Sequence, residues 1–156
     1  MTLQKVGVNL EKAYSTQDFG LGELHITESG DFYRFMQADG AVTKDLLYTV
    51  ASGFQVADAV TTTVIADTNV YPLGSSNVTL ADDEYAWIFV GPGMFTHNPD
   101  GDILVNEILY TTTTAGKLDN VATAGLVRGV MALGTVTSSA GGDIYASIPL
   151  YGENLP

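Results

Sequence analysis

Six consecutive residues, Tyr85-Ala86-Trp87-Ile88-Phe89-Val90, decide the fold class of this chain. Neighbouring side chains of a β-strand point to opposite faces, so Tyr85, Trp87 and Phe89 share one face and the residues between them share the other. Both faces are apolar, which predicts a central strand that is buried on each side. Gly91-Pro92-Gly93 follows and cannot continue a hydrogen-bonded ladder, so we expect the strand to end there.

Further short segments of β type lie on both sides of this strand, with turn residues between them. Asp39-Gly40 is a pair that tight hairpins favour, and Gly129 and Gly134 predict a bulge in the strand that contains them. Pro149 has no N–H, which places the last strand at a sheet edge or ends it there. The expected strands cover residues 32–37, 46–51, 60–66, 103–105, 108–112, 127–136 and 144–151.

Almost no helical periodicity accompanies these strands. Residues 119–126 are compatible with a short helix capped by Asp119, but Gly125 favours a loop. The chain therefore predicts an all-β fold, a compact antiparallel β-sandwich or β-barrel-like domain. We expect residues 31–156 to form this β domain. Residues 1–30 lack a sustained period and are interpreted as an extended N-terminal arm, with a frayed terminus as the alternative.

Charge and composition exclude several classes of partner. The 156 residues carry a net charge of −12, and the six cationic residues are scattered without forming a basic patch. We therefore expect no nucleic-acid partner and no attraction to anionic lipid. The chain has no cysteine and no apolar run near the roughly 20 residues that span a bilayer, and its first residues do not resemble a signal peptide. The expected place of synthesis is a cytoplasm.

A search for catalytic chemistry finds no recognisable constellation. The chain has no nucleophile elbow, no phosphate-binding loop and no complete dinucleotide motif, so we expect no enzyme activity and no cofactor. His25 and His97 stand alone, and such histidines are usually surface residues. Asn98, Asp100 and Asp102 alternate around Gly101; this favours a turn over a weak calcium site, and no metal site is assigned.

Four stretches, in this order, resemble the head-decoration (cement) proteins of tailed bacteriophages. The first runs Gly30-Asp31-Phe32-Tyr33-Arg34-Phe35-Met36-Gln37-Ala38-Asp39-Gly40-Ala41, and the second is Tyr85-Ala86-Trp87-Ile88-Phe89-Val90-Gly91-Pro92-Gly93. The third is Leu109-Tyr110-Thr111-Thr112-Thr113-Thr114-Ala115-Gly116-Lys117-Leu118-Asp119, and the fourth is Gly129-Val130-Met131-Ala132-Leu133. The resemblance spans about residues 20–150.

The resemblance implies a β-tulip-like domain that forms a homotrimer on the outer surface of a phage head. Its partner is then the shell of the major capsid protein, which it stabilises. The resemblance also implies an N-terminal arm that clamps the shell, either by adding a strand to it or by lying across subunit junctions. The corresponding capsid-binding anchors are Leu3, Val6, Val8, Leu10 and Tyr14, with tail hydrophobes of no special role as the alternative.

The residues alone leave three alternative functions open. A head fibre or host-surface glycan-binding virion protein would need an exposed aromatic or polar sugar pocket, and we expect Trp87, the single tryptophan, to be in the core instead. A non-viral β-sandwich binding module and a small hydrolase are the further alternatives.

Overall fold

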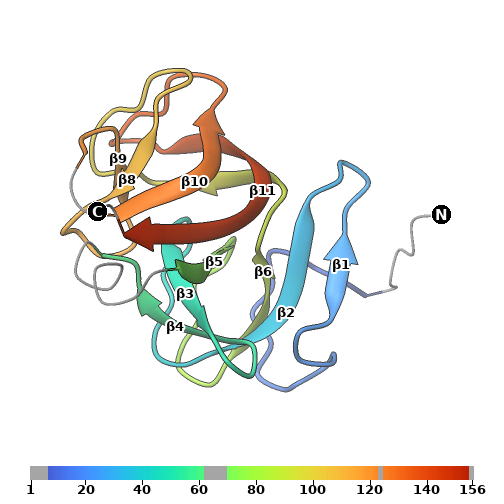
Figure 1. The fold of residues 1–156 in the computed structure, drawn as a ribbon. Coiled ribbons are helices and arrows are strands. Elements are labelled where there is room, and N and C mark those ends of the chain that lie inside the picture. Colours follow the sequence, from blue (N-terminus) through green and yellow to red (C-terminus); the bar gives the residue numbers. More distant parts are fainter. Residues whose placement is uncertain (1–6, 62–69, 123–124, 155–156) are drawn as a thin grey trace.

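Five strands close into a small barrel in the computed structural model, which describes residues 7–61, 70–122 and 125–154 (Figure 1). The barrel strands are β2 (Phe32–Ala38), β3 (Leu47–Ala51), β4 (Gln55–Ala59), β5 (Val70–Ser76) and β6 (Tyr85–Phe89). They pair in the order β2-β4-β3-β5-β6 and back to β2. Only the β2–β4 pair of this ring is parallel.

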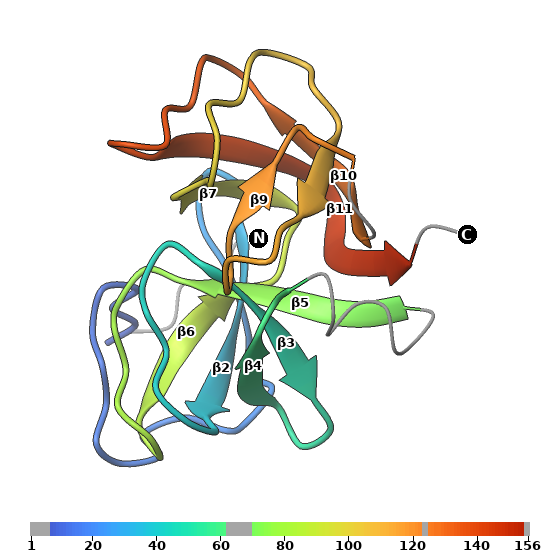
Figure 2. The same ribbon diagram turned by 90° about the vertical axis from the view of Figure 1, so that its left-hand side faces the viewer.

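A second, half-barrel sheet lies across the barrel (Figure 2). It contains β7 (Gly93–His97), β8 (Leu109–Thr111), β9 (Leu118–Asp119), β10 (Gly125–Ala132) and β11 (Gly142–Asn154). Their order is β7-β11-β10-β8-β9, and pairing of β11 with β5 joins the two sheets. The short strand β1 (Leu24–Ile26) extends the barrel wall beside β2. The predicted all-β, barrel-like fold is therefore confirmed.

Two hydrophobic cores explain why the sequence of β6 is apolar on both faces. Ala86 and Ile88 point into the barrel, where they join a cluster with Met36 and Tyr48. Trp87 and Phe89 point out of the barrel, into the larger cluster that it shares with the half-barrel. All four β6 side chains are fully buried, so the predicted central strand and the core position of Trp87 are both confirmed.

Strand β11 corrects the prediction that Pro149 marks a sheet edge. The register between β10 and β11 moves from Arg128–Tyr151 to Val130–Ala146, which leaves residues 147–150 in a wide bulge. Pro149 lies in this bulge, where no ladder hydrogen bond is required of it, inside a strand with neighbours on both sides. The same bulge contains Gly129, with φ +71°, as the glycine pattern predicted.

Three other predicted features differ in the structure. Residues 103–105 do not form a strand; Ile103 makes one isolated bridge to Val136 and the chain then turns. Asp39-Gly40 is a bend rather than a hairpin turn, because the next strand, β3, pairs with β4 and β5 and not with β2. The predicted strand at 60–66 lies largely outside the described residues, and residues 60 and 61 are not in a strand.

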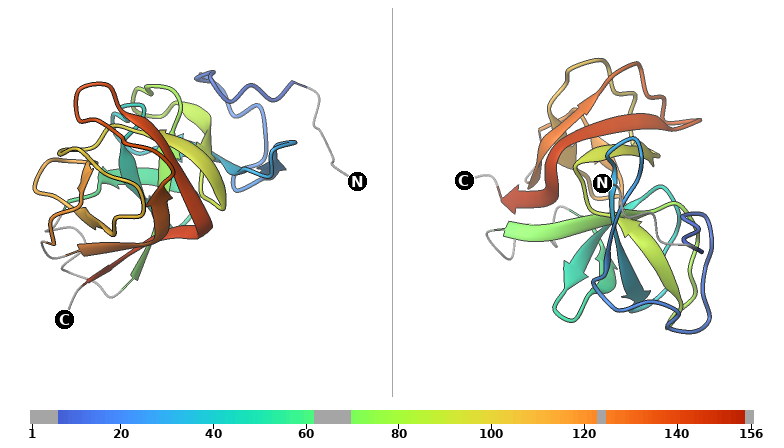
Figure 3. Two further views of the ribbon diagram at one scale, coloured as in Figure 1. Left: turned by 90° about the horizontal axis from the view of Figure 1, so that it is seen from above. Right: turned by 90° about the vertical axis from the view of Figure 1, so that its right-hand side faces the viewer.

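The described N-terminal residues lie along the barrel, and an extended arm is not shown for them (Figure 3). Tyr14 forms a bridge with Tyr85, with N–H to O=C distances of 2.8 and 2.9 Å. The Phe19 ring meets Trp87 edge-on at 5.1 Å. This segment therefore covers the part of the barrel wall that the half-barrel leaves open, without forming a regular strand over most of its length.

Candidate binding surfaces

Eight of the ten exposed large hydrophobic side chains in the described part of the molecule belong to two regions, and the other two are Tyr145 and Ile148 of β11. Six of the eight belong to the half-barrel loops and the end of β10: Leu104, Val105, Ile108, Val121, Met131 and Leu133. We call these six residues the half-barrel patch. Leu24 and Phe54 lie at a second place, the open end of the barrel. Clustered apolar exposure of this kind marks a binding surface, whereas scattered exposed hydrophobes need no explanation.

Hydrogen bonds hold the loops of the half-barrel patch together. The Glu107 carboxylate accepts a hydrogen bond from the Leu104 N–H at 2.7 Å and another from the Asn120 side-chain amide at 2.9 Å. The Asn106 N–H donates to the Ala132 carbonyl at 3.3 Å, which sets this loop beside the end of β10. The loops therefore present their apolar side chains from a fixed framework, and Ile108 is 60% exposed.

The second surface is a cavity of about 580 Å³ at the mouth of the barrel. Phe32, Arg34 and Met36 alternate along β2 and face it, because every second residue of a strand points to the barrel interior. The opposite walls come from the β3–β4 turn, the start of β5, the Gly91-Pro92 turn and the β11 bulge. The lining residues are Leu24, Phe32, Arg34, Met36, Val50, Ala51, Ser52, Gly53, Phe54, Pro72, Leu73, Val90, Gly91, Pro92, Pro149 and Leu150.

Arg34 is the charged residue of this lining, and its guanidinium is held in place. Its Nη1 donates to the Gly22 carbonyl at 2.6 Å. The guanidinium carbon lies 5.7 Å from the centre of the Phe54 ring, a cation–π distance. Phe54 has φ +60°, a conformation that is costly for a bulky residue, and its ring lies so close over Gly22 that a side chain there would collide with it.

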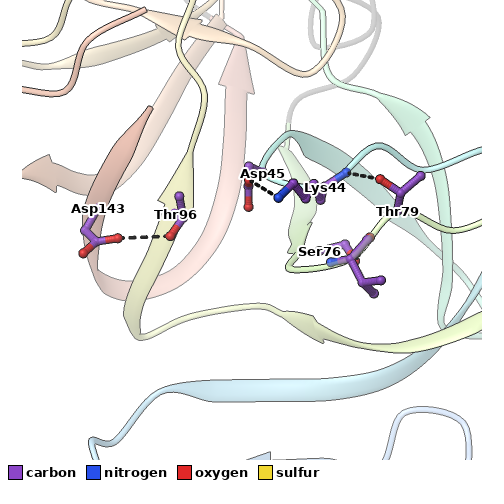
Figure 4. A network of polar contacts seen from close by, with 7 residues as sticks. Lys44, Asp45, Ser76, Thr79, Thr96 and Asp143 are labelled. Carbon is purple, nitrogen blue, oxygen red and sulfur yellow. Dashed lines mark hydrogen bonds and ion pairs between the residues drawn. The ribbon is translucent and has the colours of Figure 1, made fainter. Parts of the chain in front are cut away.

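A third, polar hollow lies between the β2–β3 and β5–β6 loops on one side and β7 and β11 on the other. It measures about 370 Å³, and its walls include Lys44, Asp45, Thr96 and Asp143 (Figure 4). Lys44 Nζ is 3.9 Å from an Asp45 carboxylate oxygen, and the Thr96 hydroxyl donates to Asp143 at 3.0 Å. Partial burial raises the pKa of Asp45, and the neighbouring Lys44 opposes this. Because Lys44 is well exposed, we assign this ion pair little stabilisation.

The two histidines differ in burial: His97 lies in the core, whereas His25 is partly exposed. His97 is fully buried at the end of β7, and its Nε2 accepts a hydrogen bond from the Leu118 N–H at 3.2 Å. Burial lowers its pKa to about 3, and the nearby Lys117 charge adds to this effect. His25 is partly buried against Trp87 at 5.6 Å, and burial lowers its pKa as well. The prediction of a surface position is therefore wrong for His97.

The carboxylates of the predicted turn are bound to hydroxyl groups. Asp100 accepts a hydrogen bond from the Thr114 hydroxyl at 2.8 Å, and Asp102 accepts two from Ser138, its N–H and its hydroxyl. These hydrogen bonds lower the pKa of the fully exposed Asp102. Among the residues that the structure describes, no three His, Asp or Glu side chains are placed to hold a metal ion. No helix in the same residues is long and apolar enough to cross a bilayer.

The five residues predicted as capsid anchors are placed unevenly. Leu3 and Val6 lie outside the described residues. Val8 and Leu10 are half-buried against the larger core, and Tyr14 is buried within it, with its ring 5.5 Å from Phe35. Sequence reasoning did not single out the half-barrel patch, Arg34 or Phe54. The alternation of Phe32, Arg34 and Met36 along β2 is the signal that could have pointed to the barrel mouth.

The structure is that of an all-β protein with an exposed apolar patch on the half-barrel and a largely apolar cavity at the barrel mouth. Comparison with protein-family models, with curated proteins and with solved structures finds no match for the chain.

Proposed function

We propose that this protein is a structural virion component that binds the outside of an icosahedral phage head and stabilises the mature capsid. The observation that carries the proposal is the half-barrel patch, an exposed apolar surface on hydrogen-bonded loops. A fixed and exposed apolar surface suits contact with another protein. The four sequence stretches that resemble decoration proteins supply the choice of partner, the major capsid protein shell.

The physical basis of the proposed activity is linkage. A protein that binds the assembled shell but not its separated subunits stabilises the shell by mass action. Weak single contacts become strong overall when copies are joined, so we propose that three copies act together as a homotrimer on the head surface. The net charge of −12 keeps free copies apart before they reach the shell.

We assign the first contact to the half-barrel patch rather than to residues 7–14. For Tyr14 to bind a capsid, it must leave a core in which it is 3% exposed, which costs about 2–3 kcal/mol before any new contact forms. Leu3 and Val6 remain proposed anchors of an arm. Because Trp87 is fully buried, it offers no platform for a sugar ring, and no observation favours the glycan-binding alternative.

The test is co-sedimentation with mature heads of the corresponding phage from which the native decoration protein has been stripped. We expect the full chain to pellet with the heads up to a saturating ratio. The double variant Ile108→Asp/Leu133→Asp should stay in the supernatant, since it puts two charges into the patch at exposed positions. Gln17→Asp, which adds charge at an exposed site on the N-terminal segment, is the control and should pellet normally.

A fourth protein, lacking residues 1–6, separates the patch from the arm. If it alone fails to pellet, the arm is the contact and the patch is not. If neither the full chain nor any variant pellets, the protein does not decorate this shell. Circular dichroism of each variant shows that its β structure is retained, and sedimentation velocity of the full chain with and without heads reports the proposed trimer.

A further inference from the structure

The barrel mouth has the composition of a small-molecule pocket. Ligand pockets usually measure about 300–1,000 Å³ and combine apolar walls with a few placed polar groups, and the mouths of β-barrels are among their usual positions. The cavity here measures about 580 Å³, and its walls come from separate segments of one chain. Alternate β2 residues Phe32 and Met36, together with Val50 and Val90, give it an apolar surface.

The charge in the cavity is opposite to that of the protein as a whole. The chain carries a net charge of −12, yet no Asp or Glu lines the mouth, and Arg34 stands in its wall. Nearby carboxylates are engaged elsewhere: Glu23 accepts the Gly20 N–H at 3.0 Å, and Asp31 accepts the Met94 N–H at 2.7 Å. Within the described residues, the Arg34 guanidinium makes one hydrogen bond, to the Gly22 carbonyl, and its other N–H groups can donate to an anion.

The position of Arg34 is fixed in advance by its surroundings. The Gly22 carbonyl holds one end of the guanidinium, and the Phe54 ring lies against its face. The backbone of Phe54 is in the left-handed region, with φ +60°, where its ring lies against Arg34. Strained residues of this kind cluster at ligand sites. A donor that is already oriented loses little side-chain entropy when a ligand binds, so a charge-assisted hydrogen bond here is favourable.

We propose that the barrel mouth binds an amphipathic carboxylate, a ligand with an apolar chain or ring and one carboxylate group. The apolar part fills the mouth against Met36, Val50 and Val90, and the carboxylate accepts hydrogen bonds from Arg34. A chain of fatty-acid type fits this description. The site is separate from the proposed shell contact, because none of the six residues of the half-barrel patch lines the mouth.

Isothermal titration with three twelve-carbon probes tests the proposal: dodecanoate, dodecanol and dodecyltrimethylammonium, each below its micelle-forming concentration. All three share one apolar chain and differ in head-group charge. We expect dodecanoate to bind at a single site at least tenfold more tightly than the other two. A difference of this size corresponds to about 1.4 kcal/mol, within the range for hydrogen bonds to a charged group.

Two variants locate the site. Arg34→Gln removes the positive charge and should weaken dodecanoate binding about tenfold or more, while leaving dodecanol binding within about twofold. Val50→Phe fills the mouth and should weaken both ligands. Lys117→Gln, which removes a positive charge away from the mouth, is the matched control and should change neither.

Three outcomes overturn the proposal. They are equal affinity for the three probes, an equal loss of dodecanoate and dodecanol binding in Arg34→Gln, and no dodecanoate binding up to about 1 mM. A short peptide with an apolar residue next to a C-terminal carboxylate provides a further arm. If the peptide competes with dodecanoate and binds much more tightly, the mouth is a peptide site, and the small-ligand assignment is wrong. Thermal unfolding of each variant establishes that it is folded under the titration conditions.

Discussion

Acid destabilisation through His97 is the sharpest stability prediction of this fold. The ring is fully buried, and its Nε2 accepts the Leu118 N–H, so the ring proton is on Nδ1 and the side chain is neutral. Protonation of Nε2 would break the hydrogen bond from the Leu118 N–H and would place a positive charge in the core. Burial and the Lys117 charge both oppose this, and the Asp45 carbonyl compensates for only part of it, so the pKa falls to about 3.

The sign and size of the effect follow from the two pKa values. The pKa of the histidine is 6.5 in the unfolded chain and falls to about 3 in the folded protein. The unfolded state therefore binds more protons between these values, and the free energy of unfolding falls as the pH drops below about 6.5. Between about pH 7.5 and about pH 5, the His97 contribution to this loss is about 2 kcal/mol.

Urea unfolding of the wild-type protein and of His97→Gln at these two pH values measures the contribution. Glutamine can still accept the Leu118 N–H but does not titrate, and every carboxylate is common to the two proteins. The lower pH stays above the isoelectric point of about 4.1, where precipitation would interfere. We expect the wild-type protein to lose about 2 kcal/mol more than the variant on acidification. Equal losses would show that His97 is not held neutral in the core.

Three further substitutions probe the packing of the fold by urea unfolding. Tyr14→Ala should lower the free energy of unfolding by about 3 kcal/mol, because it leaves a cavity at a buried site under the N-terminal segment. Tyr14→Phe removes only the hydroxyl and should cost about 1 kcal/mol or less. A negligible loss for the alanine variant would mean that the segment does not pack there. Gly129→Ala should destabilise the protein by about 1–3 kcal/mol, since the φ of Gly129 is +71° and the new Cβ would lie 2.2 Å from Ile148 Cγ1. Gly134 has open space around it, so Gly134→Ala should be neutral or slightly stabilising. Equal effects at the two glycines would contradict the bulge geometry. Asp31→Ala should cost about 2 kcal/mol, because its carboxylate accepts hydrogen bonds from both the β1–β2 turn and β7, and an unchanged midpoint would rule out that link.

The sequence was most informative where burial is local to one strand. Two apolar faces on residues 85–90 were enough to predict a central strand, because each face reports its own surroundings. The pattern does not predict which residues pack against each face of the strand. Trp87 packs on Phe19 from the N-terminal segment, and Ile88 packs within a barrel that closes only when β2 pairs with both β4 and β6.

Pro149 and His97 show why single-residue rules failed here. The absence of an N–H on Pro149 was a correct constraint, but a bulge inside β11 satisfies it as well as an edge does. His97 can be buried because the N–H of Leu118, in strand β9, donates to its ring, and no property of the residues beside His97 predicts that partner. In both cases the deciding contact comes from far along the chain.

The N-terminal segment shows the limit of periodicity as a guide. Residues 7–23 have no strand or helix period, a pattern that predicts an extended arm. In the structure the segment covers the barrel through separate anchors, Tyr14 and Phe19, joined by irregular backbone. Such a cover needs only a few well-placed aromatic residues, so it leaves no repeating pattern in the sequence.

The architecture also accounts for where the apolar surfaces lie. Closing β2 to β6 into a ring removes every strand edge from the barrel, so its interior meets solvent only at the ends, and one end is the mouth that Arg34 and Phe54 flank. The half-barrel does not close, so its loops and the end of β10 have no further strand to cover Ile108 and Leu133. A net charge of −12 offsets the tendency of such a surface to self-associate, although screening over about 8 Å at physiological salt limits this protection. Because the two surfaces share no residue, Arg34→Gln should weaken carboxylate binding without changing head binding, and Ile108→Asp/Leu133→Asp should abolish head binding without changing carboxylate binding.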